Sequence, residues 1–137
     1  MMPLPAVATD ASDAIGAQAG QEFQSPTGNI RCYLYPPEDQ EPTHSVRCDV
    51  LDFTPVWTTP PEGCDLDWGG VLWLDDKGAG IRGCVGDVVA TPSAKVLEYG
   101  ATISGGGIQC RMERPGVTCT NPEGHGFFIS REDQRIF

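Results

Sequence analysis

Hydrophobic and polar residues alternate in short stretches along the chain, and five of these stretches end in a cysteine. Four have the form β-branched, polar, cysteine, at residues 30–32, 46–48, 108–110 and 117–119. In a β-strand this order places the aliphatic side chain and the sulfur on one face, and the polar side chain on the other. No stretch shows a long helical period, so the pattern predicts an all-β fold.

The cysteine-containing stretches come in pairs, which predicts three hairpin-like units. Their paired strands are residues 30–35 with 45–50, 71–74 with 80–85, and 107–112 with 117–120. Pro115 and Gly116, before the last of these strands, suit the central positions of a type II turn. Gly83 is an extra residue in its stretch and predicts a β-bulge. Residues 126–131 read as a last strand that closes the sheet or barrel.

The alignment of the three units predicts how the six cysteines pair. Cys32 and Cys110 occupy the same place on the first strands of their units, and Trp73 stands at that place in the middle unit. Cys84 therefore has no partner in its own hairpin, and Cys64 is the one cysteine left for it. Among the connectivities that six cysteines allow, we expect Cys32–Cys48, Cys64–Cys84 and Cys110–Cys119.

The sequence divides into a linker and a single folded unit. Residues 1–21 are small and polar and lack strand alternation, which predicts a flexible linker with at most a short helix around 11–18. Residues 22–137 are expected to form one disulfide-rich domain, a small stapled sheet or barrel. Within it, residues 88–90 and 96–99 read as short additional elements.

The cysteines place this domain outside the cytosol. They are even in number and none lies closer than nine residues to the next, which is unlike a zinc motif and indicates structural disulfides. Such disulfides persist in oxidising compartments. The first twenty residues lack the apolar core of a secretory signal, so we interpret the chain as the mature portion of an exported protein. No stretch approaches the roughly 20 apolar residues of a membrane-spanning helix.

Charge and composition narrow the class of partner. The net charge is −10, and an acidic surface repels phosphate, so neither nucleic acid nor an anionic membrane is an expected partner. Seventeen glycines and twelve prolines predict many turns. No cofactor-binding motif is present, and no cofactor is predicted.

Several motifs spread over residues 23–137 carry a resemblance to one family. They are Phe23-Gln-Ser-Pro-Thr-Gly-Asn-Ile-Arg-Cys32, Val46-Arg-Cys48, Asp67-Trp-Gly69, Cys84-Val-Gly-Asp87, Leu97-Glu-Tyr-Gly100, Gly116-Val-Thr-Cys119 and Gly124-His-Gly-Phe127. Together they resemble a family of small exported actinobacterial proteins, mycobacterial ones included, that is classed as a domain of unknown function. The resemblance implies export, often behind a signal peptide or a lipoprotein anchor. It implies no activity, cofactor or catalytic residue.

His125 is the first candidate for chemistry, because glycines on both sides give a ligand close access. With Ser104 and a carboxylate it would make up a hydrolase triad, although no G-x-S-x-G elbow surrounds Ser104. The competing interpretation is a structural loop histidine, and His44, in its polar loop, reads as a surface residue. A small extracellular hydrolase that uses His125 with a nearby serine or carboxylate is the alternative function.

Carboxylates suggest a second kind of site. Asp65, Asp67, Asp75 and Asp76 are candidate calcium ligands, since an Asp-x-Asp pair supplies two of the oxygen ligands that calcium requires. No EF-hand loop surrounds them. The competing interpretation is an acidic turn region that keeps the surface soluble; it is preferred, and no metal is predicted.

Aromatic residues give the main hint of function. Tyr33 and Tyr35 fall on the strand face opposite the cysteine, and with Trp57 they are the candidate binding residues. Trp68 and Trp73 read as residues that cover the disulfides and complete the core. The sequence therefore predicts an exported, non-enzymatic binding or interaction domain of the cell envelope or secreted fraction, whose partner is a protein or an envelope glycan.

Overall fold

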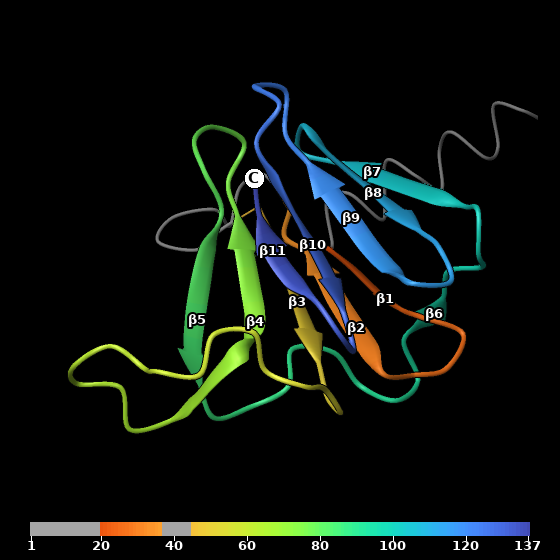
Figure 1. Ribbon diagram of the computed structural model, residues 1–137. Helices are drawn as coiled ribbons and strands as arrows, with labels where there is room; N and C mark the ends of the chain where they lie inside the picture. The colour runs from red at the N-terminus through yellow and green to blue at the C-terminus, as the bar shows by residue number, and fades with distance from the viewer. Residues whose placement is uncertain (1–19, 37–44) are drawn as a thin grey trace, which may run out of the picture.

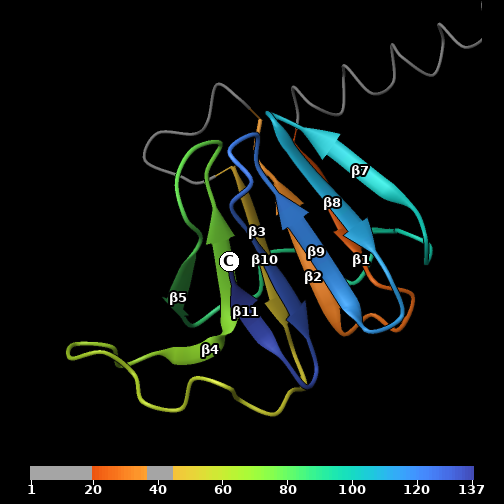
Figure 2. The same ribbon diagram turned by 45° about the horizontal axis from the view of Figure 1, so that its top comes forward.

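The computed structural model describes residues 20–36 and 45–137. These residues contain eleven β-strands, joined by turns and loops, and no helix. The strands belong to two sheets that lie face to face (Figures 1 and 2). Their order in the first sheet is β5 (Ile81–Val85), β4 (Asp67–Leu74), β3 (Val46–Val50), β2 (Ile30–Leu34), β1 (Gln21–Gln24) and β6 (Lys95–Val96). In the second sheet it is β11 (Gln134–Ile136), β10 (Gly126–Ser130), β9 (Gly116–Thr120), β8 (Ile108–Met112) and β7 (Thr102–Gly105).

The three predicted hairpins and the three predicted disulfides are confirmed. β2 pairs with β3, β4 with β5, and β8 with β9, all antiparallel. The disulfides are Cys32–Cys48, Cys64–Cys84 and Cys110–Cys119. The first and third join residues directly opposite each other within a hairpin, whereas Cys64–Cys84 ties the β3–β4 connection to the edge strand β5.

The core lies between the two sheets and follows from the alternation. Cys32, Cys48, Cys110 and Cys119 are fully buried there among aliphatic and aromatic side chains from both sheets. Along β2 the exposure alternates, with Ile30, Cys32 and Leu34 buried and the residues between them half-buried. Two of the three disulfides therefore act both as cross-links and as core side chains.

The predicted place of Trp73 is wrong by one residue. Across β3 and β4, Cys48 faces Leu72, which is fully buried in the core, while Trp73 faces Arg47 on the outer face of the sheet. The cysteine pairing survives this correction because neither Leu72 nor Trp73 carries a thiol.

The β-bulge predicted at Gly83 lies instead in β4, on the opposite strand. Trp68 pairs with Cys84 and Leu72 with Arg82, so four steps along β4 match two steps along β5. The two additional residues of β4 thus lie opposite Gly83, and because their number is even, side chains continue to alternate between the same two faces beyond the bulge.

The predicted type II turn between β8 and β9 is also wrong. Such a turn needs a positive φ at its second central residue, and Gly116 is not among the glycines with positive φ. Gly116 is instead the first residue of β9, where its N-terminal neighbours Arg114 and Pro115 form the loop. A Cβ atom there would lie 2.2 Å from the Ile129 carbonyl oxygen, so close approach to β10 is what requires glycine.

Replacing Gly116 by alanine is expected to lower the free energy of unfolding by about 1–3 kcal/mol, because the obstructing atom belongs to the backbone of β10 and cannot rotate away. The urea midpoint of the variant, compared with that of Gly86→Ala, measures this loss. A Cβ at Gly86 meets its nearest atom, on Leu66, at an ordinary 3.4 Å. Equal midpoints for the two variants would contradict the packing argument.

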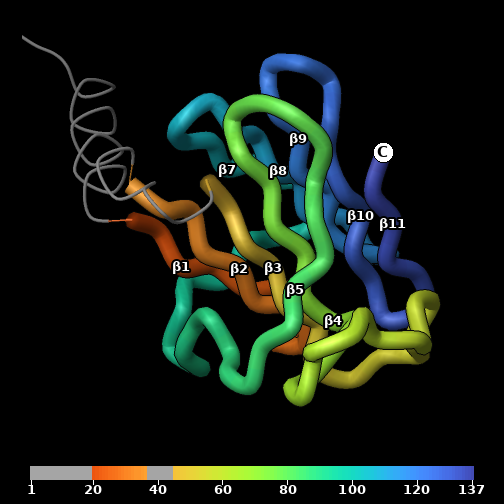
Figure 3. Tube along the Cα trace, turned by 90° about the vertical axis from the view of Figure 1, so that its left-hand side faces the viewer, coloured from red at the N-terminus to blue at the C-terminus, as the bar shows by residue number. Residues whose placement is uncertain are grey.

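One connection crosses the outer face of the first sheet from edge to edge. Residues 86–94 leave β5, run along the outer side of β3 and β1 and reach β6, which pairs parallel to β1 (Figure 3). Of the two short elements expected in this region, residues 88–90 form no strand, and residues 96–99 contribute only Val96 to β6.

The last predicted strand is present as β10, and β11 follows it as a further partner that the sequence did not suggest. The helix expected around residues 11–18 lies outside the described residues.

Candidate functional site

A buried ion pair lies on the outer face of the first sheet. Arg47 and Asp49 alternate along β3, so both side chains point away from the core. Arg47 Nε lies 2.9 Å from Asp49 Oδ1, and its Nη2 lies 2.9 Å from Asp49 Oδ2, which is bidentate geometry. Arg47 is 7 % exposed and Asp49 is 3 % exposed, so the pair is shielded from water.

Burial also changes the titration of this cluster. Desolvation raises the pKa of Asp49 above its ordinary value, although the hydrogen bonds and charge of Arg47 act in the opposite direction. The pKa of the nearby Tyr35 phenol is likewise raised by burial, against the opposing charge of Arg47.

The ion pair anchors the 86–94 connection to the sheet. Arg47 Nη2 donates to the Asp87 carbonyl oxygen at 3.0 Å and contacts Asp87 Oδ1 at 3.1 Å. Asp49 Oδ2 accepts the Val89 amide at 3.0 Å. Further along, Gln24 Nε2 donates to the carbonyl of Ala94 at 2.7 Å. Arg47 and Asp49 are therefore fully engaged in holding the fold, which makes this pair a structural site.

The predicted aromatic binding residues do not form one surface. Tyr33 and Tyr35 lie on the outer face, with ring centroids 4.7 Å apart in an edge-to-face arrangement. Tyr33 faces Arg47, and Arg47 faces Trp73, in a row across β2, β3 and β4. Trp57 instead packs against the core cluster, and the Arg82 guanidinium lies 3.9 Å from its ring centroid. The binding role of these residues stays a prediction.

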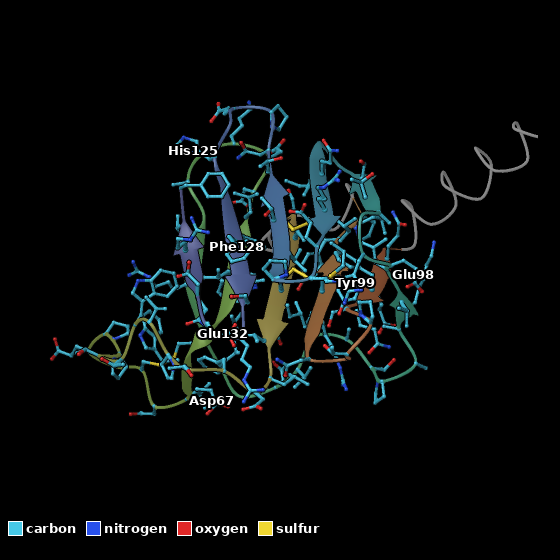
Figure 4. The ribbon with its side chains drawn as sticks, turned by 45° about the vertical axis from the view of Figure 1, so that its right-hand side comes forward. Asp67, Glu98, Tyr99, His125, Phe128 and Glu132 are labelled. Carbon is cyan, nitrogen blue, oxygen red and sulfur yellow. A yellow bond between two sulfur atoms is a disulfide. The ribbon has the colours of Figure 1, made fainter. Side chains whose placement is uncertain are left out.

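The candidate catalytic residues are separated. Ser104 lies on β7, and β8 and β9 stand between it and β10, which follows His125. The Asn121 side chain organises the loop of His125: its Oδ1 accepts the His125 amide at 3.1 Å, and its Nδ2 donates to the Gly78 carbonyl at 2.9 Å. His125 lies at the end of the sandwich opposite Glu132 (Figure 4). His44 lies outside the described residues.

The candidate calcium ligands are also divided between two places. Asp65 and Asp67 lie at the start of β4, whereas Asp75 and Asp76 follow its last residue. A strand rises about 3.3 Å per residue, so the length of β4 separates the two pairs. Within residues 20–36 and 45–137, no group of three or more His, Cys, Asp or Glu side chains is arranged to hold a metal ion.

A polar cleft of about 410 Å³ opens at one end of the sandwich, where several connections meet. Its polar lining is Ser25, Thr27 and Asn29 from the β1–β2 turn, Asp52 after β3, Tyr99 before β7, Glu113 and Arg114 from the β8–β9 turn, and Arg131 and Glu132 from the β10–β11 turn. Tyr99 and Glu132 therefore come from different connections (Figure 4). Loops at the end of a β-sandwich are a common location for binding sites.

Side-chain contacts shape this cleft before any ligand arrives. Asn29 Nδ2 donates to the Asp52 carbonyl at 2.9 Å, and the Asp52 amide donates back to Asn29 Oδ1 at 2.8 Å, which joins two of the lining connections. The Arg114 guanidinium lies 4.8 Å from the centroid of the half-buried Tyr99 ring. Arg131 Nη2 lies 3.5 Å from Asp52 Oδ2 at the rim.

The polar cleft combines hydrogen-bond donors and acceptors with one aromatic ring, that of Tyr99. The sequence did not single out Tyr99, Arg114 or Asn29 as site residues, because they lie in three separate connections and share no motif. Arg47 and Asp49, in contrast, lie two residues apart in a predicted strand. This spacing alone places both side chains on the same face of the sheet.

These features define a small, disulfide-stapled, two-sheet β protein with a polar cleft at one end. The chain belongs to a family described as a family of unknown function (DUF6636), whose match spans residues 1–137. Comparison with curated proteins finds no match, and neither does comparison with solved structures. Three disulfides are consistent with an extracytoplasmic protein. The described residues include no helix with the length and hydropathy needed to cross a membrane.

Proposed function

We propose that the protein is an exported, non-enzymatic binding domain of the envelope or secreted fraction of an actinobacterium, and that its ligand is an envelope glycan held in the polar cleft. The observation that carries the proposal is the lining of that cleft, in which polar side chains from several connections surround Tyr99. The disulfides support a rigid extracytoplasmic domain.

The chemistry of the cleft favours a neutral saccharide over a charged ligand. Asp52, Glu113 and Glu132 stand against Arg114 and Arg131, three carboxylates against two guanidinium groups, so the charges nearly balance. Carboxylates accept hydrogen bonds from sugar hydroxyls, and guanidinium groups donate to sugar oxygens. The apolar face of a sugar ring packs on an aromatic side chain.

The expected result is that Tyr99→Leu weakens saccharide binding about tenfold, because leucine keeps the apolar packing of Tyr99 but removes the flat ring face. The probes are neutral oligosaccharides of two to six glucose, galactose, mannose, arabinose or N-acetylglucosamine units, tested by isothermal titration calorimetry. Amide chemical shifts of isotope-labelled protein then locate the binding at Asn29 and Tyr99.

Tyr33→Leu is the matched control, since it makes the same change on the outer face of the sheet. Loss of binding in Tyr33→Leu but not in Tyr99→Leu would move the site to the outer face and contradict the proposal. Failure of every saccharide to bind would contradict it too. Chromatography of each saccharide after incubation tests the alternative function, since shortened products would indicate a hydrolase.

A further inference from the structure

A second cleft, of about 350 Å³, lies on the outer side of the first sheet near the start of β4. Its walls come from the end of β3 and the residues after it, from the first residues of β4, and from the end of β5 with the start of the 86–94 connection. It shares no lining residue with the polar cleft. Leu51 and Phe53 line the second cleft, whereas Asp52 between them lines the first.

Apolar side chains form the inner walls of this second cleft. Leu51 is 40 % exposed and Val88 is 46 % exposed, and the half-buried side chains of Phe53 and Trp68 line the cleft with them. The Phe53 ring rests directly on Gly70, where a Cβ atom would lie 2.8 Å from a ring carbon. Exposed apolar surface that is concave and rimmed by polar groups is typical of a binding site.

The rim of the second cleft carries negative charge in excess. Asp49, Asp67 and Asp87 line it, and Arg47 is the one cation that contacts them among the residues that the structure describes. Three carboxylates against one guanidinium leave two negative charges. Asp67 is exposed and the Asp87 side chain is 76 % exposed, so both remain accessible to a ligand.

The wall also holds a polar group without a partner. Trp68 Nε1 is buried and has no hydrogen-bond partner among the described residues. An unmade hydrogen bond of this kind is unusual in a folded protein. A ligand that offers a hydrogen-bond acceptor, such as a peptide carbonyl, suits an unpaired indole N–H in a wall residue.

We infer that this second cleft binds a protein partner through an extended peptide segment in which a lysine or arginine lies next to a bulky apolar residue. The apolar side chain packs between Leu51, Phe53 and Val88. The cationic side chain reaches Asp67 and Asp87 at the rim, and the aromatic walls add attraction for a cation. Charge complementarity selects this partner over an acidic or an uncharged one.

The probe is the peptide acetyl-Ser-Leu-Lys-Leu-Ser-amide, titrated into the full chain by calorimetry at 50 and 500 mM NaCl. We expect saturable binding that weakens at the higher salt concentration, since exposed charges are screened. Replacing lysine by norleucine, or both leucines by serine, should each weaken binding about fivefold or more. The double variant Asp67→Asn/Asp87→Asn should weaken it about tenfold.

The matched control is Asp76→Asn/Glu123→Gln, which removes the same charge at the opposite end of the sandwich and should bind the peptide normally. Equal weakening in both double variants would show general attraction to an acidic protein and overturn the inference. So would absence of binding, or equally tight binding of lysine amide alone. Tyr99→Leu should bind the peptide as the unmodified chain does, so this result stands apart from the saccharide test.

Discussion

Replacing Arg47 by methionine is expected to lower the free energy of unfolding by about 3–5 kcal/mol. The substitution leaves the Asp49 carboxylate buried, at 3 % exposure, with the Val89 amide as its remaining hydrogen-bond donor among the described residues. An uncompensated buried charge is costly because water cannot solvate it. Urea unfolding followed by tryptophan fluorescence measures the change, with the slope of the transition checked for two-state behaviour.

One further variant separates the effect of the buried charge from a loss of side-chain packing, and another gives the cost of breaking an exposed ion pair. In Arg47→Met/Asp49→Leu no charge is left buried, so most of the lost stability should return. Arg111→Ala breaks an exposed pair with Glu113, in which the two side chains are 53 % and 50 % exposed, and it should cost less than about 1 kcal/mol. A cost below about 1 kcal/mol for Arg47→Met would contradict the role assigned to the pair.

Amide hydrogen exchange tests where the Arg47→Met variant is destabilised. Arg47 and Asp49 hold residues 86–94 through the Asp87 carbonyl and the Val89 amide. Their loss should increase amide exchange in this connection before the strands of the core are affected. Because Asp87 and Val88 line the second cleft, Arg47→Met should also weaken binding of the basic peptide.

Removing the Cys32–Cys48 disulfide with Cys32→Ala/Cys48→Ala is expected to cost about 3–5 kcal/mol. The cross-link closes a separation of 16 residues in the unfolded chain, and both sulfurs are also fully buried between the sheets. The variant therefore gains chain entropy when unfolded and leaves a void when folded. Thermal and urea unfolding without reductant measure the loss.

The comparison variant is Cys64→Ala/Cys84→Ala. This disulfide closes the longer separation of 20 residues, but its two cysteines are only half-buried. Loop closure alone ranks it as the more costly to remove, by a small margin. We expect the reverse order, because core packing is lost only with Cys32–Cys48. A larger loss in the Cys64–Cys84 variant would contradict this reasoning.

Alternation in the sequence was enough to identify the hairpins and to pair the cysteines. The period of two fixes which side chains share a strand face, and consecutive strands usually lie next to each other. Those two constraints put Cys32 opposite Cys48 and Cys110 opposite Cys119. Cys64 and Cys84 then followed by elimination.

The place of Trp73 and the turn at Gly116 were not accessible in the same way. The face on which Trp73 lies depends on how β4 pairs with β3, and the need for glycine at position 116 depends on how closely β9 approaches β10. Both are relations between strands, and neither is written in the alternation of one strand. The sequence therefore placed the wrong residue, Trp73, at the core position of Leu72.

The amino-acid sequence alone determined the all-β class, the hairpins and the disulfides of this protein, because these depend on residues that are close in the chain or share a strand period. Only the tertiary structure decided which residues meet in the two clefts. Asn29, Tyr99 and Arg114 come together because three distant connections end on one side of the sandwich. The burial of Arg47 with Asp49 likewise depends on a connection that crosses the sheet from far along the chain.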